Sequence, residues 1–334
     1  MVRCCIDDAN PNTAGVKFST RTSTARSLRH KCVLMVFCSS GLLTSYLLWG
    51  LIQERVMVIQ YGPDEHFTNS LFLEFMNRIL ALAFATVILL VQQQPTHIAP
   101  AYKYSYNALS NVMSSWCQYE ALKYVSFPVQ VLAKAAKVIP VMLMGKVVSQ
   151  QTYSLLEYMT AAMISTGLFM FVMSTDAASQ ATKATSSTIS GVILLVGYLG
   201  FDAFTSNWQS QLYRVYNMSS TQMMAGSNLF AVIFAGVSLI EQGGFVEAVD
   251  FMARHPLFIF HVAAMSITSA VGQLFIYFTI AKFGPVTFTI IMTVRQGFAI
   301  MLSCIIYHHS VSPFGLLGII LCFTAIFIRT CCSR

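Results

Sequence analysis

Charged residues are scarce in this chain of 334 residues. Asp, Glu, Lys and Arg make up 10% of it, 56% of the residues are hydrophobic, and the mean hydropathy is +0.64. So little charge excludes an ordinary soluble domain and indicates a polytopic membrane protein in contact with the lipid bilayer. The net charge of +7 lies largely at the ends of the apolar runs, so it does not indicate a nucleic-acid partner.

Motifs for catalysis and for metal binding are missing as well. The HExxH, GxSxG and P-loop patterns do not occur, so the sequence offers no catalytic residue and we do not expect an enzyme. The nine cysteines form neither a disulfide framework nor a zinc pattern, and we interpret them as packing residues or inert thiols. No metal and no cofactor are expected.

Long apolar runs are what the sequence does contain. A membrane helix requires roughly 17 to 25 residues. Ten runs reach about this length: 33–52, 70–91, 105–122, 127–148, 155–174, 188–209, 221–241, 257–280, 285–307 and 312–328. We therefore expect an all-α polytopic membrane protein with ten transmembrane helices.

Charges in the connections predict the orientation. If the N-terminus is cytosolic, the cytosolic side receives most of the basic residues and the opposite side receives most of the acids. The positive-inside rule then places both termini in the cytosol. The glycosylation sequon at Asn217 would also be cytosolic and should carry no glycan.

A short internal repeat divides the chain into two halves. Tyr119–Val129 resembles Tyr277–Val286, and a basic residue, Lys137 or Arg295, follows the proline of each segment at a similar distance. Because each half has an odd number of spans, the second should run inverted, as in many secondary transporters. The expected parts are a disordered cytosolic tail (1–31), a first five-helix half (32–174), a lumenal linker (175–187), a second half (188–330) and a short cytosolic tail (331–334).

Two lysines within the run 127–148 draw attention to one stretch. A cation at the centre of a membrane helix costs roughly 2.5 to 3.5 kcal/mol. Lys134 and Lys137 are three residues apart, so a continuous helix would place both on one face, with Gln130 one turn earlier. Pro140 would kink this helix. Like charges on a kinked helix indicate that something anionic binds there.

Other intramembrane charges complete the set. The eight that lie in or near the runs are Arg78, Lys134, Lys137, Arg295, Glu74, Glu120, Glu157 and Asp202. Glu74 and Arg78 are four residues apart and can pair with each other. Glu120 and Glu157 are expected to compensate part of the lysine charge. Arg295 has no acid one turn away on its own helix, so three cations should face a wet cavity, an acid or a ligand.

Polar and aromatic side chains near these charges fit a nucleotide. Thr289, Thr293 and Gln296 share one helical face beside Arg295. Other groups that could stack on or hydrogen-bond a ligand are Tyr106, Trp116, Tyr119, Tyr198, Phe201, Trp208, Gln118, Gln130, Asn207, Gln209 and Asn228. The candidate substrate-binding residues are Lys134, Lys137, Arg295, Gln130, Gln296, Thr293, Tyr119 and Asn228.

Four segments carry a resemblance to a known family. They are Ser45–Met57, Ser110–Lys146, Gly200–Tyr213 and Gly284–Ser303. The chain resembles the nucleotide-sugar transporter family of the drug/metabolite transporter superfamily, and within it the Golgi carriers of PAPS (adenosine 3′-phosphate 5′-phosphosulfate). This resemblance implies ten helices in two inverted five-helix halves around a central site. It also implies exchange of cytosolic PAPS for lumenal PAP or a related adenine nucleotide, which supplies lumenal sulfation; a homodimer is a candidate assembly.

The charge of PAPS suits three cations. Its two phosphates and one sulfate carry roughly four negative charges, because a phosphomonoester approaches −2, whereas a diphosphate-linked sugar carries about two. Two alternatives stay open. The same fold could carry another anionic nucleotide, such as a UDP-sugar or ATP, or the chain could be a receptor or scaffold whose buried lysines only pair with acids.

Overall fold

The computed structural model describes residues 12–332, with gaps at residues 59, 63–64, 68, 94–98, 122–123, 126–129, 131–132, 135, 174–188 and 307–312. The helices are α1 (Asn12–Val58), α2 (Ser70–Val91), α3 (Tyr102–Ala121), α5 (Val138–Val148), α6 (Leu155–Met173), α8 (Ile189–Tyr216), α9 (Ser220–Glu241), α10 (Gly244–Arg254), α11 (Pro256–Ile306) and α12 (Pro313–Cys332). Strands β1 (Gln60–Gly62) and β2 (Glu65–His66) form a small antiparallel hairpin.

Helices dominate the fold, as the apolar runs predict. Within the described residues, five helices are long and apolar enough to cross a membrane, and three shorter ones are also apolar. A helical element lies at each of the ten predicted runs, because the long helix α11 contains two of them. The all-α polytopic prediction is thereby confirmed, with β1 and β2 as a minor addition.

Helix α11 is divided in its middle. Gly284 has φ 81° and ψ 171°, which only glycine adopts readily, and Pro285 follows it. The two parts of α11 correspond to the predicted runs 257–280 and 285–307. The break re-aims the second part, which carries Arg295.

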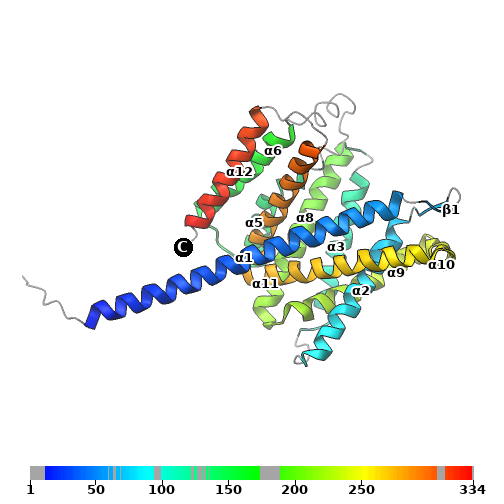
Figure 1. Ribbon diagram of the computed structural model, residues 1–334, viewed down its shortest axis with the longest axis horizontal. Helices are drawn as coiled ribbons and strands as arrows, with labels where there is room; N and C mark the ends of the chain where they lie inside the picture. Colours follow the sequence, from blue (N-terminus) through cyan, green and yellow to red (C-terminus); the bar gives the residue numbers. More distant parts are fainter. Residues whose placement is uncertain are drawn as a thin grey trace, which may run out of the picture.

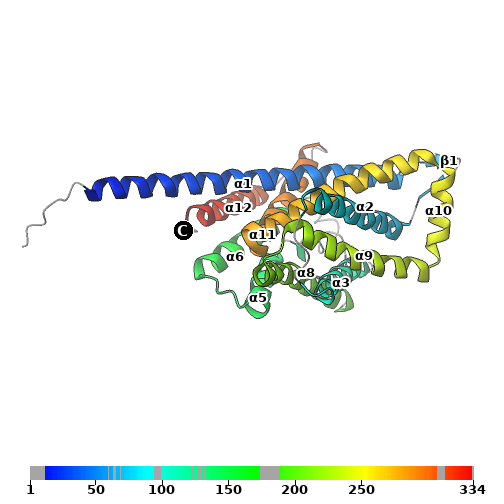
Figure 2. The same cartoon turned by 90° about the horizontal axis from the view of Figure 1, so that it is seen from below.

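The first helix begins earlier than the sequence predicts. We expected a disordered tail over residues 1–31, but α1 starts at Asn12, directly after Pro11, and continues without interruption to Val58. Its first turns run out beyond the rest of the bundle (Figures 1 and 2). No proline occurs inside this helix, and extending an existing helix costs far less than nucleating a new one. Residues 1–11 lie outside the described part of the chain.

One end of the bundle is closed by an aromatic cluster. The Asn69 side chain accepts a hydrogen bond from the Phe72 N–H and so caps α2. At the same end α9 stops at Glu241, and Gly243, with a φ of +68°, lets the chain turn into the short helix α10. Phe67, beside the hairpin, then packs against the rings of Phe251 on α10 and Phe258 on α11. We call this the hairpin end.

Helix contacts reflect two equivalent halves. With α1, α2, α3, α5 and α6 as membrane helices one to five, and α8, α9, the two parts of α11 and α12 as six to ten, the most extensive contacts are α6–α12, α3–α8, α1–α11 and α2–α9. Ring packing between Phe37 and Phe275 places α1 beside the first part of α11. If each helix is exchanged for its counterpart in the other half, the contact between helices two and seven and the contact between helices five and ten are unchanged. The contact between helices three and six becomes the contact between helices eight and one. Such a pattern is what an internal two-fold repeat produces.

Candidate functional site

Lys137 lies just before the first turn of α5. Its backbone has φ −65° and ψ −16°, and its carbonyl accepts a hydrogen bond from the Val141 N–H at 3.1 Å. Pro140 therefore falls in the first turn of α5, where its missing N–H leaves no hydrogen bond unmade. The kinked helix over 127–148 stays a prediction, because part of this stretch before Lys137 lies outside the described residues.

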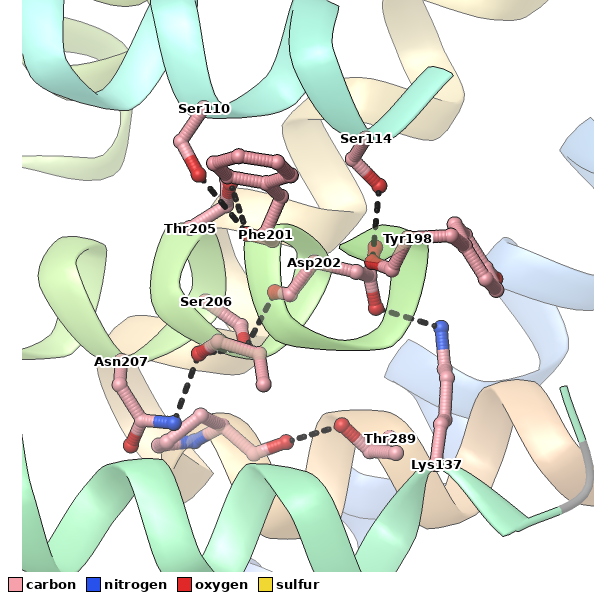
Figure 3. Close-up of polar contacts among 12 residues, drawn as sticks. Ser110, Ser114, Lys137, Tyr198, Phe201, Asp202, Thr205, Ser206, Asn207 and Thr289 are labelled. Carbon is pink, nitrogen blue, oxygen red and sulfur yellow. Dashed lines mark hydrogen bonds and ion pairs between the residues drawn. The ribbon is translucent and has the colours of Figure 1, made fainter. Parts of the chain in front are cut away.

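Lys137 forms an ion pair with Asp202 on α8. The Nζ–Oδ2 distance is 3.0 Å, and the side chains are 13% and 30% exposed, respectively. Figure 3 shows Asp202 reaching across from α8 to the lysine at the start of α5. Of the three surroundings expected for the cations, a wet cavity, an acid or a ligand, Lys137 therefore has the acid. Asp202 was recognised among the intramembrane charges, but its helix partner could not be inferred from spacing along the chain.

Lys134 keeps its predicted lack of an acid partner. Among the described residues it has no ion pair, although it is partly buried. The positive charges of Lys137 and Arg295 act on it unfavourably, and Asp202 acts on it favourably. Lys134, Lys137 and Arg295 therefore form one cluster of cations, in which the Asp202 carboxylate acts on the two lysines.

Arg295 enters the cluster from the second part of α11. Its guanidinium carbon lies 5.7 Å from the centre of the Tyr46 ring on α1, within cation–π range. Its Nε is buried and has no hydrogen-bond partner among the described residues. A buried guanidinium nitrogen without a partner is costly unless a ligand or water completes its hydrogen bonds.

A second charged group borders the first. Glu74 and Arg78 on α2 pair at 2.7 Å, as predicted, and Arg78 also donates to Asn111 Oδ1 on α3 at 2.9 Å. The charges of Arg78 and Arg295 both act on the Tyr46 hydroxyl. Tyr46 thus lies close enough to both arginines to be affected by their charges, and it contacts Arg295, a role that the sequence analysis missed.

The remaining predicted site residues have different positions. Gln130 is buried, and its amide donates to the carbonyl of Gln118 at 2.7 Å, so it holds the chain against the end of α3. Thr293 is buried on α11, and its Oγ1 has no partner among the described residues. The side chains of Tyr119 and Gln296 lie outside the described part of the structure.

Asn228 belongs to a buried polar layer between α9 and α11. Its Nδ2 donates to Gln273 Oε1 at 2.9 Å and to the Met224 carbonyl at 2.8 Å, while its Oδ1 has no partner among the described residues. Asn107 on α3 continues the layer, since its amide donates to Ser227 Oγ at 2.7 Å. These side-chain amides link helices of both halves. The Asn228 side-chain oxygen, Oδ1, is an unused acceptor among the described residues and could accept a hydrogen bond from a ligand.

Other predicted groups lie at known positions. The Glu157 carboxylate accepts from the Ser154 N–H at 2.9 Å at the start of α6, and Asp202 is the carboxylate that pairs with Lys137. Of the candidate stacking rings, Tyr198 is buried near Lys137 and Asp202. Other rings face outward: Tyr106, Trp116 and Phe201 are exposed.

Comparison with known proteins agrees with this architecture. The family model described as "UAA transporter family" matches residues 34–333. The chain is 51% identical to "Adenosine 3′-phospho 5′-phosphosulfate transporter 1" of Homo sapiens, over 98% of this chain and 77% of that one. The protein of the same name from Drosophila melanogaster is 48% identical, over 98% and 71%.

More distant relatives extend the comparison. "UDP-galactose/UDP-glucose transporter 5" of Arabidopsis thaliana is 39% identical, over 92% of this chain and 89% of that one. A chain of known crystal structure superposes with a TM-score of 0.65 at 10% identity, over 90% of this chain and 98% of that one. The last match concerns the fold alone.

Proposed function

Since this chain belongs to the UAA transporter family, we propose that it is an antiporter that moves PAPS from the cytosol into the Golgi lumen in exchange for PAP or a related adenine nucleotide. Lumenal PAPS would then serve as the sulfate donor for sulfation. The relatives named as carriers of this nucleotide, at 48% to 51% identity, support the choice of substrate.

The charge balance of the site is the observation that carries the proposal. Lys134, Lys137 and Arg295 bring three positive charges, and Asp202 returns one. A nucleotide with roughly four negative charges, given that each phosphomonoester approaches −2, would more than balance this net excess of two and would attract all three cations while Asp202 stays charged. Lysines bind phosphate as mobile point charges, while an arginine can hold an oxyanion through two parallel hydrogen bonds.

Another anionic nucleotide is the alternative substrate. The Arabidopsis relative is named for UDP-galactose and UDP-glucose, and it shares 39% of its residues with this chain over the matched region. A UDP-sugar with about two negative charges would balance only the net charge that Asp202 leaves, whereas PAPS carries further charge with which to attract Lys137 away from Asp202. A receptor or scaffold is a weaker alternative, because Asp202 accounts for Lys137 but leaves Lys134 and Arg295 without an acid among the described residues.

Exchange follows from the same charges. An alternating-access carrier passes through a closed state that excludes water. Closing an empty site would bury mutually repelling cations, whereas bound phosphates neutralise them. A penalty of about 4 kcal/mol would slow the return of the empty carrier roughly a thousandfold.

Reconstitution tests this function directly. Purified protein in liposomes should take up labelled PAPS, and uptake should be much faster when the vesicles are preloaded with PAP than when they are empty. Unlabelled PAPS and PAP should compete more strongly than UDP-galactose, UDP-glucose or ATP. Stronger competition by a UDP-sugar would favour the alternative substrate, and no flux of any nucleotide would favour the receptor.

Orientation needs its own test. Tags at Met1 and Arg334 should be reached by antibodies after the plasma membrane alone is permeabilised, because the charge asymmetry places both termini in the cytosol. Asn217, which is exposed between α8 and α9, should carry no glycan. A glycan at this residue would mean that the helix count or the orientation is wrong.

A further inference from the structure

The pair Lys137–Asp202 differs from the other ion pairs that the structure describes. Glu74–Arg78 and Asp250–Arg254 each join residues four apart on one helix. Lys137–Asp202 instead joins the start of α5 to the middle of α8, across 65 residues of sequence. An acid that pairs with a site cation from another helix can change the charge of the site as well as stabilise the fold.

We infer that Asp202 is an internal counter-anion, which neutralises Lys137 while the site is empty and releases it when a nucleotide phosphate binds. This inference rests on the proposed function and deepens it. It identifies the residue that sets how strictly the carrier depends on exchange. Asp202 acts here through Lys137, as a positioning residue.

The geometry suits a pair that opens and closes. Asp202 holds Lys137 through one 3.0 Å contact between Nζ and Oδ2, rather than through the two parallel bonds that an arginine would allow. A lysine ammonium has three donors on a flexible stem, so it can turn to a new acceptor. With side-chain exposures of 13% and 30%, the pair is also within reach of water or a ligand.

The neighbouring charges supply the driving force for opening. The positive charges of Lys134, Lys137 and Arg295 repel one another. Asp202 is the carboxylate with the largest effect on the two lysines. A bound phosphate attracts all three cations but repels Asp202. The bound phosphate and the Asp202 carboxylate therefore compete for Lys137. Asp202 weakens the binding of an anion, and it also reduces the free-energy cost of closing the empty site.

Asp202→Asn separates these two effects. The substitution keeps the shape of the side chain but removes its charge. We expect PAP to bind about tenfold more tightly at low ionic strength, since the competing charge is gone. We also expect PAPS uptake into empty liposomes to fall about tenfold relative to uptake into PAP-loaded liposomes, because the empty site then closes over uncompensated cations.

Matched variants show whether the charge is responsible. Asp250→Asn removes an acid from an exposed ion pair at the hairpin end and should leave both measurements unchanged. Asp202→Glu keeps the charge and should restore the ratio of the two uptake rates. In a Lys137→Gln background, adding Asp202→Asn should raise PAP affinity by clearly less than the increase of about tenfold expected in the wild-type background, because the competition for Lys137 no longer exists and only the direct repulsion between Asp202 and phosphate is removed.

The last comparison also answers the case in which Asp202→Asn alone does not fold. The double variant buries no unpaired lysine, and its PAP affinity can still be compared with that of Lys137→Gln. Weaker PAP binding with an unchanged ratio of uptake rates would make Asp202 a structural clamp and overturn the inference. Wild-type protein that exchanges no PAPS for PAP would overturn the proposed function as well, so the two failures are distinguishable.

Discussion

Lys137 and Arg295 lie in the fourth and ninth membrane helices, which correspond to each other in a chain of two five-helix halves, yet their surroundings differ. Lys137 meets the carboxylate of Asp202 on the sixth helix, α8. Arg295 meets the ring of Tyr46 on the first helix, α1. The first and sixth helices also correspond to each other. At equivalent positions, one half therefore places an acid beside its cation and the other half places a neutral aromatic ring; we call these the acidic corner (Lys137 and Asp202) and the aromatic corner (Arg295 and Tyr46).

This difference separates two ways of keeping a cation in a membrane protein. An acid neutralises the charge but must be displaced by an anionic ligand. A ring stabilises a cation by about 0.5 to 2 kcal/mol without removing its charge, and it leaves the N–H groups available. The buried Nε of Arg295 without a partner fits the second arrangement. Arg295 thus has a hydrogen-bond donor without a partner among the described residues, whereas Lys137 is paired with Asp202.

Removing either lysine should have the largest effect on transport. Lys134→Ala and Lys137→Ala each delete a charge from a site that must neutralise about four negative charges. We expect uptake of PAPS by reconstituted protein to fall by about a hundredfold, which corresponds to roughly 2.7 kcal/mol. Lys146→Ala, at an exposed position near the end of α5, is the matched control and should transport normally.

Protein level and thermal stability must be measured beside uptake. Normal uptake by both variants would remove the lysines from the site. The two lysines should also differ from each other. Lys137→Ala leaves Asp202 without its partner, so this variant should lose more thermal stability than Lys134→Ala, whose lysine has no ion pair among the described residues.

Close packing between α6 and α12, the last helix of each half, should give the next largest effect. Each of these two helices has a glycine at the contact. Gly167 on α6 and Gly318 on α12 bring two helices together so closely that a Cβ atom on Gly167 would lie 2.6 Å from the Gly318 carbonyl oxygen. Gly167→Ala and Gly318→Ala should each destabilise the protein by about 1 to 3 kcal/mol. Thermal unfolding in detergent should show a lower midpoint for both, with Gly200→Ala as a control in open space.

Much of this architecture could be predicted from the sequence because hydropathy and charge asymmetry are local. The ten apolar runs, the Glu74–Arg78 pair and the nearness of Lys134 to Lys137 depend on composition or short spacing. The start of α5 was missed because Pro140 favours both a kink and a first turn, and a long apolar run hides the difference.

Partners on other helices could not be predicted. Asp202 and Tyr46 meet Lys137 and Arg295 only through tertiary packing, across 65 residues in the first case. One signal was available for Asp202, since a lone carboxylate inside a membrane run is expected to have a partner. Tyr46 carried no such signal, because aromatic residues are common in membrane helices for packing alone.

Arg295→Lys tests the aromatic corner, which Arg295 and Tyr46 form. The variant keeps the charge but loses the planar group that can face Tyr46 and bind an oxyanion through two bonds. We expect the ratio of maximal rate to KM for PAPS uptake to fall about tenfold, or roughly 1.4 kcal/mol. Arg254→Lys, in an exposed pair with Asp250, is the matched control. If Arg295→Lys transports normally, a point charge is sufficient there and the two corners do not differ in this way.

The smallest effect should come from Tyr46, and it is the sharpest test of the aromatic corner. Tyr46→Phe keeps the ring that lies 5.7 Å from the Arg295 guanidinium carbon, so uptake and KM for PAPS should stay close to the wild-type values. Tyr46→Leu keeps an apolar side chain but removes the π face. A cation–π interaction of about 1 kcal/mol then predicts about a fivefold rise in KM. The same substitution in an Arg295→Ala background should have no further effect on KM, because the ring would have no cation to hold. Equal effects of Tyr46→Leu in both backgrounds would show that the ring only fills space, and that Arg295 is held by something other than Tyr46.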